Sequence, residues 1–122
     1  MWNIGVDIVD IDRFRRVPYS DHKRFYDRVF TPREIEYCLF FGNPAQHFAA
    51  TFAGKEAVYK ALNEHLDIKL HEIEIVRDES GTPQVSLKTG LPVEVKVSLS
   101  HSSSLAVAFA IVRFPELGVK SG

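Results

Sequence analysis

A carboxylate stands inside the apolar face of the longest helix that the sequence predicts. Glu56 lies in the run Phe52–Leu62, with Phe52 four residues before it and Lys60 four residues after it. Residues spaced by four share one face of a helix. Burying a charged side chain is costly unless a partner compensates for it. An ordinary Glu–Lys pair on a half-exposed face is one interpretation, and a carboxylate held for binding or catalysis is the other.

A second carboxylate, Asp7, interrupts a short alternating segment near the N-terminus, Ile4–Val9. Gly5, Asp7 and Val9 fall on one face of this predicted strand. Aspartate is uncommon in strands, and Gly5 leaves room for a ligand or another backbone. An edge strand with a solvent-facing acid is the alternative. Two such carboxylates suit Mg²⁺, which takes oxygen ligands and keeps several waters and substrate phosphates around it.

The segment Val97–Ser104 places hydroxyl groups and an imidazole between two alternating strands, predicted over 93–100 and 105–113. Ser100 and His101 therefore lie at or near the tip of a hairpin. Hydroxyls, an imidazole and turn amides together can contact a phosphate. Serine-rich turns also arise for purely local reasons.

Capping and proline signals divide the rest of the chain. Thr31-Pro-Arg-Glu34 is a capping box with proline at the first helical position, and Asn43-Pro-Ala-Gln46 repeats that start signal. The further elements expected are short helices within 12–30 broken near 18, a helix from 31 to 42, a long helix from 43 to about 65, and strands over 72–77, 84–88, 93–100 and 105–113. We predict an α+β fold with an N-terminal strand, helices that include one long central helix, and then an antiparallel set of strands. Gly54 in the long helix costs about 1 kcal/mol relative to alanine, which indicates a close approach to the sheet or to a ligand.

Composition favours one globular domain over 1–114 and a loose tail over 115–122. The 122 residues are 45% hydrophobic and 25% charged, ordinary values for a globular protein. A lone cysteine, Cys38, excludes an internal disulfide framework and suits a reducing cytoplasm. The sequence shows no signal peptide and no apolar run that could span a bilayer, and its net charge is −1. We therefore expect a cytoplasmic protein with neither a membrane nor a nucleic acid as its partner.

Positive charge concentrates in residues 13–33, here called the basic stretch, which holds seven basic side chains against two acidic ones. A local positive field speeds encounter with an acidic partner more than it deepens affinity. A solvated helical face is the plainer alternative.

Three motifs of this chain resemble those of holo-[acyl-carrier-protein] synthases, the small single-domain 4′-phosphopantetheinyl transferases. They are Gly5-Val-Asp-Ile-Val-Asp-Ile-Asp-Arg13, the run Phe52–Leu62, and Val97-Ser-Leu-Ser-His101, in the order and spacing of that family. The resemblance extends from Gly5 to about Val112. It implies a Mg²⁺-dependent transferase of fatty acid biosynthesis that moves the 4′-phosphopantetheine arm of coenzyme A onto a serine of apo acyl carrier protein and releases adenosine 3′,5′-bisphosphate. It also implies a homotrimer with active sites between protomers.

The resemblance implies roles for particular residues. Asp7 and Glu56 would bind Mg²⁺, and Lys60 would lie against a phosphate. The general base stays open between His101 and Glu56, the latter acting through a water on the metal. Contacts to coenzyme A are expected from Lys55, Lys60, Ser100, His101, Gly81 and Pro83, and carrier-protein docking from Arg13, Arg24 and Arg28.

The chain departs from the family pattern at two places. Thr51 stands where the family usually has an arginine, and Asn63-Glu-His-Leu-Asp67 replaces a Gly-Thr-Gly-like turn. Both changes remove an expected phosphate or nucleotide contact. Two other function classes remain open: a non-catalytic module that binds coenzyme A or a carrier protein, and a structural trimer-forming domain whose acids are merely solvated. A row of alanines at 106, 108 and 110 favours tight packing by a helix or a neighbouring subunit.

Overall fold

The computed structural model describes residues 1–88 and 92–115 of the chain. The tail predicted over 115–122 falls outside these residues except for its first member. The elements are, in chain order, β1 (Trp2–Asp10), α1 (Asp12–Arg15), the 3-10 turn η1 (Tyr19–Asp21), α2 (Lys23–Val29), α3 (Pro32–Leu39), α4 (Pro44–Leu62), the 3-10 turn η2 (Leu70–Glu72), β2 (Ile73–Arg77), β3 (Pro83–Leu87), β4 (Glu94–His101) and β5 (Leu105–Arg113).

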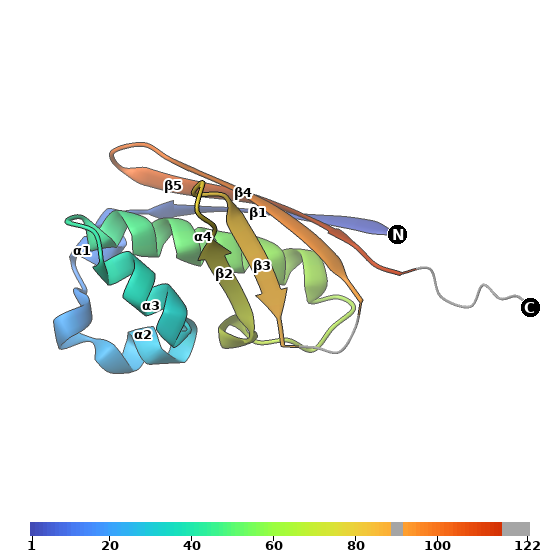
Figure 1. Cartoon of the computed structure of the whole chain (residues 1–122), viewed down its shortest axis with the longest axis horizontal. Helices are drawn as coiled ribbons and strands as arrows, with labels where there is room; N and C mark the ends of the chain where they lie inside the picture. The colour runs from blue at the N-terminus through green and yellow to red at the C-terminus, as the bar shows by residue number, and fades with distance from the viewer. Residues whose placement is uncertain (89–91, 116–122) are drawn as a thin grey trace, which may run out of the picture.

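The strands form two antiparallel sheets arranged around α4. One sheet has the order β1-β5-β4, and the other is the hairpin of β2 and β3. In Figure 1 the strands β1, β5 and β4 lie along one side of α4, the hairpin crosses α4, and α1, α2 and α3 gather at its N-terminal end. This arrangement confirms the predicted α+β fold class, with its N-terminal strand, long central helix and antiparallel strands.

Two glycines allow α4 to lie directly against the strands. A Cβ atom at Gly5 would collide with the backbone carbonyl of Ala57, so β1 and α4 touch through main chain. A Cβ atom at Gly54 would lie 2.6 Å from the Ile75 side chain and 2.9 Å from that of Leu99. The close approaches predicted at Gly5 and Gly54 are therefore contacts between α4 and the strands.

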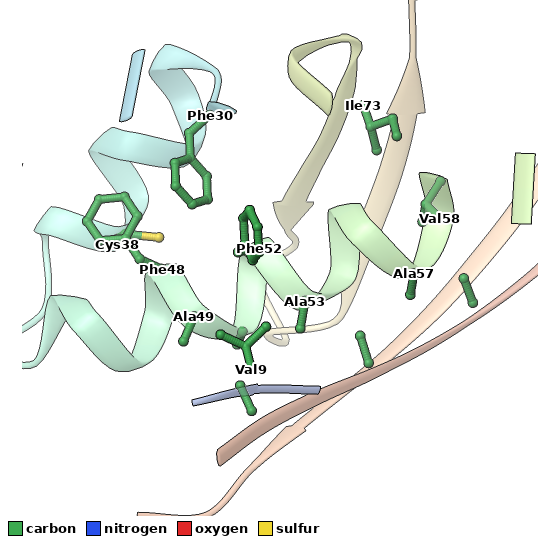
Figure 2. Packing of buried hydrophobic residues seen from close by; sticks show 14 of the residues in the cluster. Val9, Phe30, Cys38, Phe48, Ala49, Phe52, Ala53, Ala57, Val58 and Ile73 are labelled. Atoms are coloured by element: carbon green, nitrogen blue, oxygen red, sulfur yellow. The ribbon is translucent and has the colours of Figure 1, made fainter. Parts of the chain in front are cut away.

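Small and aromatic side chains fill the space on the two sides of α4. The predicted alanine row on β5 faces the helix, with Ala106, Ala108 and Ala110 at most 1% exposed. At the N-terminal end of α4, interlocking aromatic rings form the core between this helix and the short helices (Figure 2). Phe48 of α4 joins that packing, 4.6 Å from the Tyr26 ring centroid and 5.1 Å from that of Phe30.

The helix boundaries differ slightly from those that the sequence predicts. The capping box is present, because the Thr31 hydroxyl accepts from the Glu34 backbone N–H and the Glu34 carboxylate accepts from the Thr31 N–H. However, α3 ends at Leu39 rather than at residue 42, and α4 at Leu62 rather than near residue 65. Asn43 does not cap α4, because its amide donates to the side chain of Gln46 instead of accepting a backbone N–H.

The face of the three-stranded sheet opposite α4 is apolar and uncovered. Ile4, Val6 and Ile8 of β1 are 57–62% exposed. Val6 pairs with Phe109 and Ile8 with Val107, and these two β5 side chains are 45% and 37% exposed. A contiguous apolar surface of this kind is unusual on a monomer and marks an interaction site. We call it the outer sheet face.

Within residues 1–88 and 92–115, the structure contains no helix with both the length and the hydropathy required to traverse a bilayer.

Candidate active site

Asp7, Glu56 and Lys60 come together where β1 crosses α4, and we call this group the carboxylate site. The Lys60 ammonium donates to Asp7 Oδ1 and to the Val6 carbonyl, each at 3.0 Å. The Gly5 contact that brings β1 onto α4 is what allows these side chains to meet. Asp7 keeps 16% of its side chain exposed and Lys60 keeps 51%. The site is thus open to solvent on its Lys60 side.

The two carboxylates lie close enough to repel each other. Burial raises the pKa of Glu56, and the negative charge of Asp7 raises it further, while Lys60 and Arg13 oppose that shift. Within the described residues Glu56 accepts no hydrogen bond and forms no ion pair with another side chain. A half-buried carboxylate beside a second carboxylate is a place where a cation is favourable.

The two carboxylates fit a hard divalent cation whose other coordination positions are taken by substrate and water oxygens. One carboxylate comes from β1 and one from α4, and Lys60 occupies only one oxygen of Asp7. Among the residues that the structure describes, no group of three or more histidine, cysteine or acidic side chains could enclose a metal. Mg²⁺ is commonly bound by one or two carboxylates together with phosphate oxygens, whereas a dedicated protein cage is typical of other metals.

Arg13 borders the carboxylate site from the start of α1. Its guanidinium carbon lies 5.2 Å from the ring centroid of Phe52. Its positive charge lowers the pKa of Glu56. Arg24 and Arg28 are exposed on α2. The three predicted docking arginines therefore lie on solvent-accessible surface that begins at the site and continues along the short helices.

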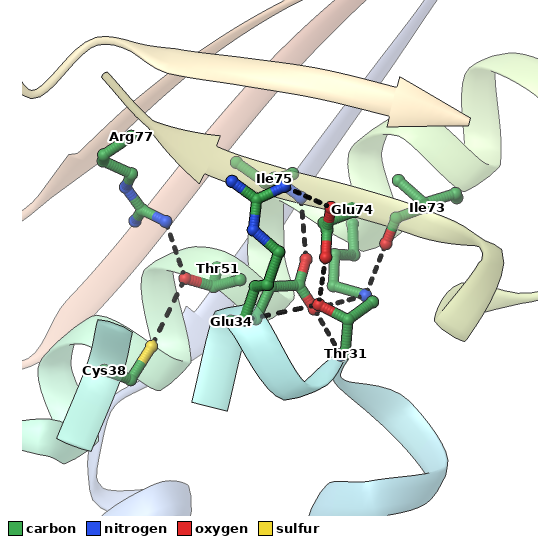
Figure 3. Close-up of polar contacts among 10 residues, drawn as sticks. Thr31, Glu34, Cys38, Thr51, Ile73, Glu74, Ile75 and Arg77 are labelled. Carbon is green, nitrogen blue, oxygen red and sulfur yellow. Dashed lines mark hydrogen bonds and ion pairs between the residues drawn. The ribbon is translucent and has the colours of Figure 1, made fainter. Parts of the chain in front are cut away.

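Lys55 does not face outward, and the expectation that it contacts the nucleotide from the surface is wrong. Its side chain is 0% exposed, and its ammonium lies 2.6 Å from Glu34 Oε1 and donates also to the Ile73 carbonyl. Figure 3 shows Glu34 between Thr31 and β2, where its carboxylate accepts a hydrogen bond from the Ile75 backbone N–H. The physical reason is helical spacing, because Lys55 is one position before Glu56 and so turns toward α3 and β2.

His101 lies at the N-terminal end of α4. Its Nε2 is 2.9 Å from the Gln46 side-chain nitrogen, and its Nδ1 is 3.3 Å from the Ser102 carbonyl. Both contacts are satisfied when Nδ1 carries the proton and Nε2 accepts from the Gln46 amide. Gln46 precedes Glu56 by ten residues, so this end of the helix is about 15 Å from the carboxylate site. Within one chain, His101 and the carboxylates do not converge.

Ser100 points away from His101. Alternate residues of a strand face opposite sides, and β4 alternates so that Ser98 and Ser100 lie on the exposed side while Val97 and Leu99 face α4. Ser100 pairs with Val107 of the outer sheet face. The sequence prediction placed Ser100 and His101 in one set of contacts, and the pleat of β4 separates them within one chain.

Gly81 and Pro83 lie in and after the turn between β2 and β3. Gly81 has φ of +86°, which glycine adopts without strain, and Asp78 accepts hydrogen bonds from the backbone of Ser80 and Thr82 to hold the turn. Pro83 pairs with Arg77 across the hairpin. These two predicted coenzyme contacts thus lie beside a residue that the sequence interpretation passed over.

Arg77 is that residue, and it reaches Thr51 of α4. Its Nη1 donates to Thr51 Oγ1 at 2.9 Å (Figure 3). Its guanidinium lies 5.0 Å from the ring centroid of Tyr37. No local sequence signal marks Arg77, because a basic residue at a strand end is usually a solvated one. Its position depends on a contact between segments 26 residues apart.

The chain matches the model of the 4′-phosphopantetheinyl transferase superfamily over residues 3–110. It is 44% identical over 113 residues to holo-[acyl-carrier-protein] synthase of Chlorobaculum parvum, covering 90% of this chain and 97% of the relative.

Among solved structures it is similar to the synthase of Bacillus anthracis in complex with CoA (3′,5′-ADP), with TM-score 0.77, 27% identity and coverage of 93% of this chain and 96% of that one. It is also similar to the Helicobacter pylori synthase in complex with coenzyme A, with TM-score 0.77, 27% identity and coverage of 90% and 99%. The fold, the extent of these matches and the motifs agree: this chain belongs to the 4′-phosphopantetheinyl transferase superfamily.

Proposed function

We propose that this protein is a holo-[acyl-carrier-protein] synthase that transfers the 4′-phosphopantetheine arm of coenzyme A to a serine of apo acyl carrier protein. The single observation that carries the proposal is the convergence of Asp7 and Glu56 from distant parts of the chain. Lys60 of α4 donates a hydrogen bond to Asp7 of β1 at the same place. The serine oxygen forms a bond to the β-phosphorus, and the bond from that phosphorus to the bridging oxygen breaks. Adenosine 3′,5′-bisphosphate leaves with the bridging oxygen.

The residues of the carboxylate site suit a reaction at a diphosphate. Phosphoryl transfer depends mainly on alignment and on neutralising negative charge. Asp7 and Glu56 would hold Mg²⁺, which when bound supplies positive charge to the diphosphate oxygens. Lys60 anchors Asp7 and presents an ammonium, half exposed, on the same side. Its positive charge is available to the oxygens of the leaving phosphate.

The proton of the attacking serine needs an acceptor at the same place. Glu56 is at the carboxylate site, and because its carboxylate would hold the metal, it would take the proton through a water rather than directly. His101 of the same chain is remote from that point, held by Gln46. We therefore assign proton acceptance to Glu56 and place His101 with the nucleotide part of the coenzyme.

In one chain His101 is remote from the carboxylate site, and a second copy of the chain would bring these two groups together. The diphosphate and the 3′-phosphate of coenzyme A are attached to one ribose, so they are closer together than the two ends of α4. A neighbouring copy that covers the outer sheet face can bring its own His101 toward the carboxylate site of the first. We propose a homotrimer, because a head-to-tail interface closes into a ring and uses the same apolar surface in every copy.

The basic stretch is proposed to dock the carrier. Arg13, Arg24 and Arg28 are exposed, and within the described residues none of them forms an ion pair with an acidic side chain. An acidic carrier protein approaching this surface would deliver its serine beside Glu56, since Arg13 borders the carboxylate site. A free, buried thiol at Cys38 accords with a cytoplasmic setting for such a step in fatty acid biosynthesis.

The test is incubation of the purified protein with coenzyme A, Mg²⁺ and an apo acyl carrier protein, followed by intact-mass measurement of the carrier. We expect the carrier to gain the mass of one phosphopantetheine arm, and we expect chelation of the metal to abolish the gain. A protein that binds coenzyme A but leaves the carrier mass unchanged would be a binding module, and the proposed function would be wrong.

A further inference from the structure

Three side chains that can carry positive charge gather at the N-terminal end of α4. They are His47, Arg77 and His101, and we call them the basic cluster. The His47 ring stacks on Phe41 with centroids 3.9 Å apart, and it lies 5.9 Å from Tyr37, the ring over which Arg77 is held. The charges of Arg77 and His101 both act on His47, whose pKa is lowered first by burial and then by these two neighbours. The three groups are therefore close together in space.

The basic cluster has no acidic partner among residues 1–88 and 92–115. None of the ion pairs formed there includes a member of the cluster. Asp78, the residue after Arg77, has its carboxylate engaged by Ser80, Thr82 and Gln84 in the hairpin turn. The Arg77 guanidinium thus stays charged without an acidic partner, beside two imidazoles that can donate hydrogen bonds, so the arrangement is one that an anion would stabilise.

Arg77 is the member best placed to bind that anion. Thr51 Oγ1 and the Tyr37 ring fix its guanidinium, while the Thr51 bond uses only one of its five N–H donors. Arg77 is only partly buried, so the remaining donors are not sealed in the core. A planar guanidinium held in this way matches a phosphate, to which it can donate two parallel hydrogen bonds.

We propose that Arg77 binds the 3′-phosphomonoester of coenzyme A and so determines selectivity for coenzyme A over its 3′-dephospho form. This inference rests on the proposed function and deepens it. The Thr51 hydroxyl of α4 accepts a hydrogen bond from the guanidinium of Arg77. The strand β2 thereby supplies a fixed cation at this end of the helix. Gly81 and Pro83 lie at the same end of the hairpin, since Pro83 pairs with Arg77.

The test compares two ligands by isothermal titration calorimetry, without carrier protein and with Mg²⁺ present. We expect the wild type to bind coenzyme A more tightly than 3′-dephospho-coenzyme A. Arg77→Met should lower the affinity for coenzyme A by about tenfold to a hundredfold, the range for hydrogen bonds to a charged group. Its affinity for 3′-dephospho-coenzyme A should be unchanged. In turnover the same variant should raise KM for coenzyme A and leave kcat near its original value, because the contact is remote from the reacting phosphorus.

Arg33→Met is the matched control, because Arg33 is 68% exposed and its single partner, Glu74, lies outside the basic cluster. A second variant guards against a purely structural effect. Thr51→Arg combined with Arg77→Met returns a guanidinium to the cluster from the helix, and we expect it to restore the preference for coenzyme A.

An equal loss of affinity for both ligands in Arg77→Met, or no loss for either, would overturn the inference, as would a wild type without preference. These outcomes are distinct from failure of the proposed function. In that case the wild type would leave the carrier mass unchanged whatever its ligand preference.

Discussion

Lys55 and Glu34 form an ion pair in which Nζ and Oε1 are 2.6 Å apart and both side chains are wholly buried. The pair joins α4 to α3, and through Glu34 it also satisfies backbone N–H groups at Thr31 and Ile75. Burial lowers the pKa of Lys55 and raises that of Glu34, and the attraction between them opposes both shifts. The lysine that the sequence suggested as a ligand contact is thus a structural residue.

Lys55→Met should therefore destabilise the fold without a specific effect on ligand choice. Removing one partner of a buried ion pair typically costs about 3–5 kcal/mol of unfolding free energy. Urea denaturation would measure this loss. The double variant Lys55→Met with Glu34→Gln should be more stable than the single one, because it removes the negative charge that the single variant leaves buried without a partner. A double variant less stable than Lys55→Met would contradict this account.

Removing either carboxylate of the carboxylate site should slow transfer strongly while preserving the fold. Asp7→Asn and Glu56→Gln are each expected to lower kcat by about 10²–10³-fold, a typical loss for one electrostatic contact in a transition state. Without metal, Glu56→Gln should raise the unfolding temperature slightly, since it relieves repulsion from Asp7. Mg²⁺ should raise the unfolding temperature of the wild type and not of the variants. Glu36→Gln, an exposed glutamate on α3, is the control.

Carrier docking should depend on charge in the basic stretch. Arg24→Glu and Arg28→Glu together are expected to raise KM for the carrier by about tenfold with kcat unchanged, because electrostatic steering acts on encounter. For the wild type, KM for the carrier should rise with salt, and this dependence should weaken in the variant. Lys88→Glu makes a charge reversal outside the stretch and serves as control. A carrier KM that is insensitive to salt would exclude the docking role.

The outer sheet face should hold the copies of the proposed trimer together. Ile4 is 62% exposed in the single chain, so Ile4→Glu should leave the chain folded but lower its mass in solution from three copies toward one. Sedimentation velocity gives the mass, and circular dichroism checks the fold. Transfer activity should fall with dissociation. As a control, Glu79→Lys on the β2–β3 turn should change neither the mass in solution nor the transfer activity. A wild type that sediments as a monomer would disprove the interface.

Cys38 should make the fold sensitive to alkali. Burial raises the pKa of its thiol from 9.0 to about 12 in the folded protein. A pKa raised by folding contributes stability that is complete below the unfolded value and is lost as pH rises toward the folded value. Between pH 8 and pH 10, the wild type should therefore lose about 1.4 kcal/mol more unfolding free energy than Cys38→Ala. Urea denaturation at pH 8 and pH 10 measures the unfolding free energy of both proteins. Equal losses in the wild type and in Cys38→Ala would show that folding does not raise the pKa of the thiol.

Local patterns were enough to predict most of the elements and the carboxylate site. The capping box at Thr31, the four-residue spacing of Glu56 and Lys60, and the alternation around Asp7 each depend on neighbours along the chain. The family motifs then indicated that the two acids act together. Helix ends were less well predicted, because the last turns of α3 and α4 depend on packing and not on a single residue type.

The sequence by itself determined which side chains are present on each face of each strand and helix, and hence that two acids and a lysine could form a site. Only the tertiary structure decided that Lys55 is buried against Glu34, that His101 lies beside Gln46, and that Arg77 lies on Thr51. The physical reason is that helix and strand periodicity fix the direction of a side chain within its own element. Which group it meets there depends on the packing of elements far apart along the chain.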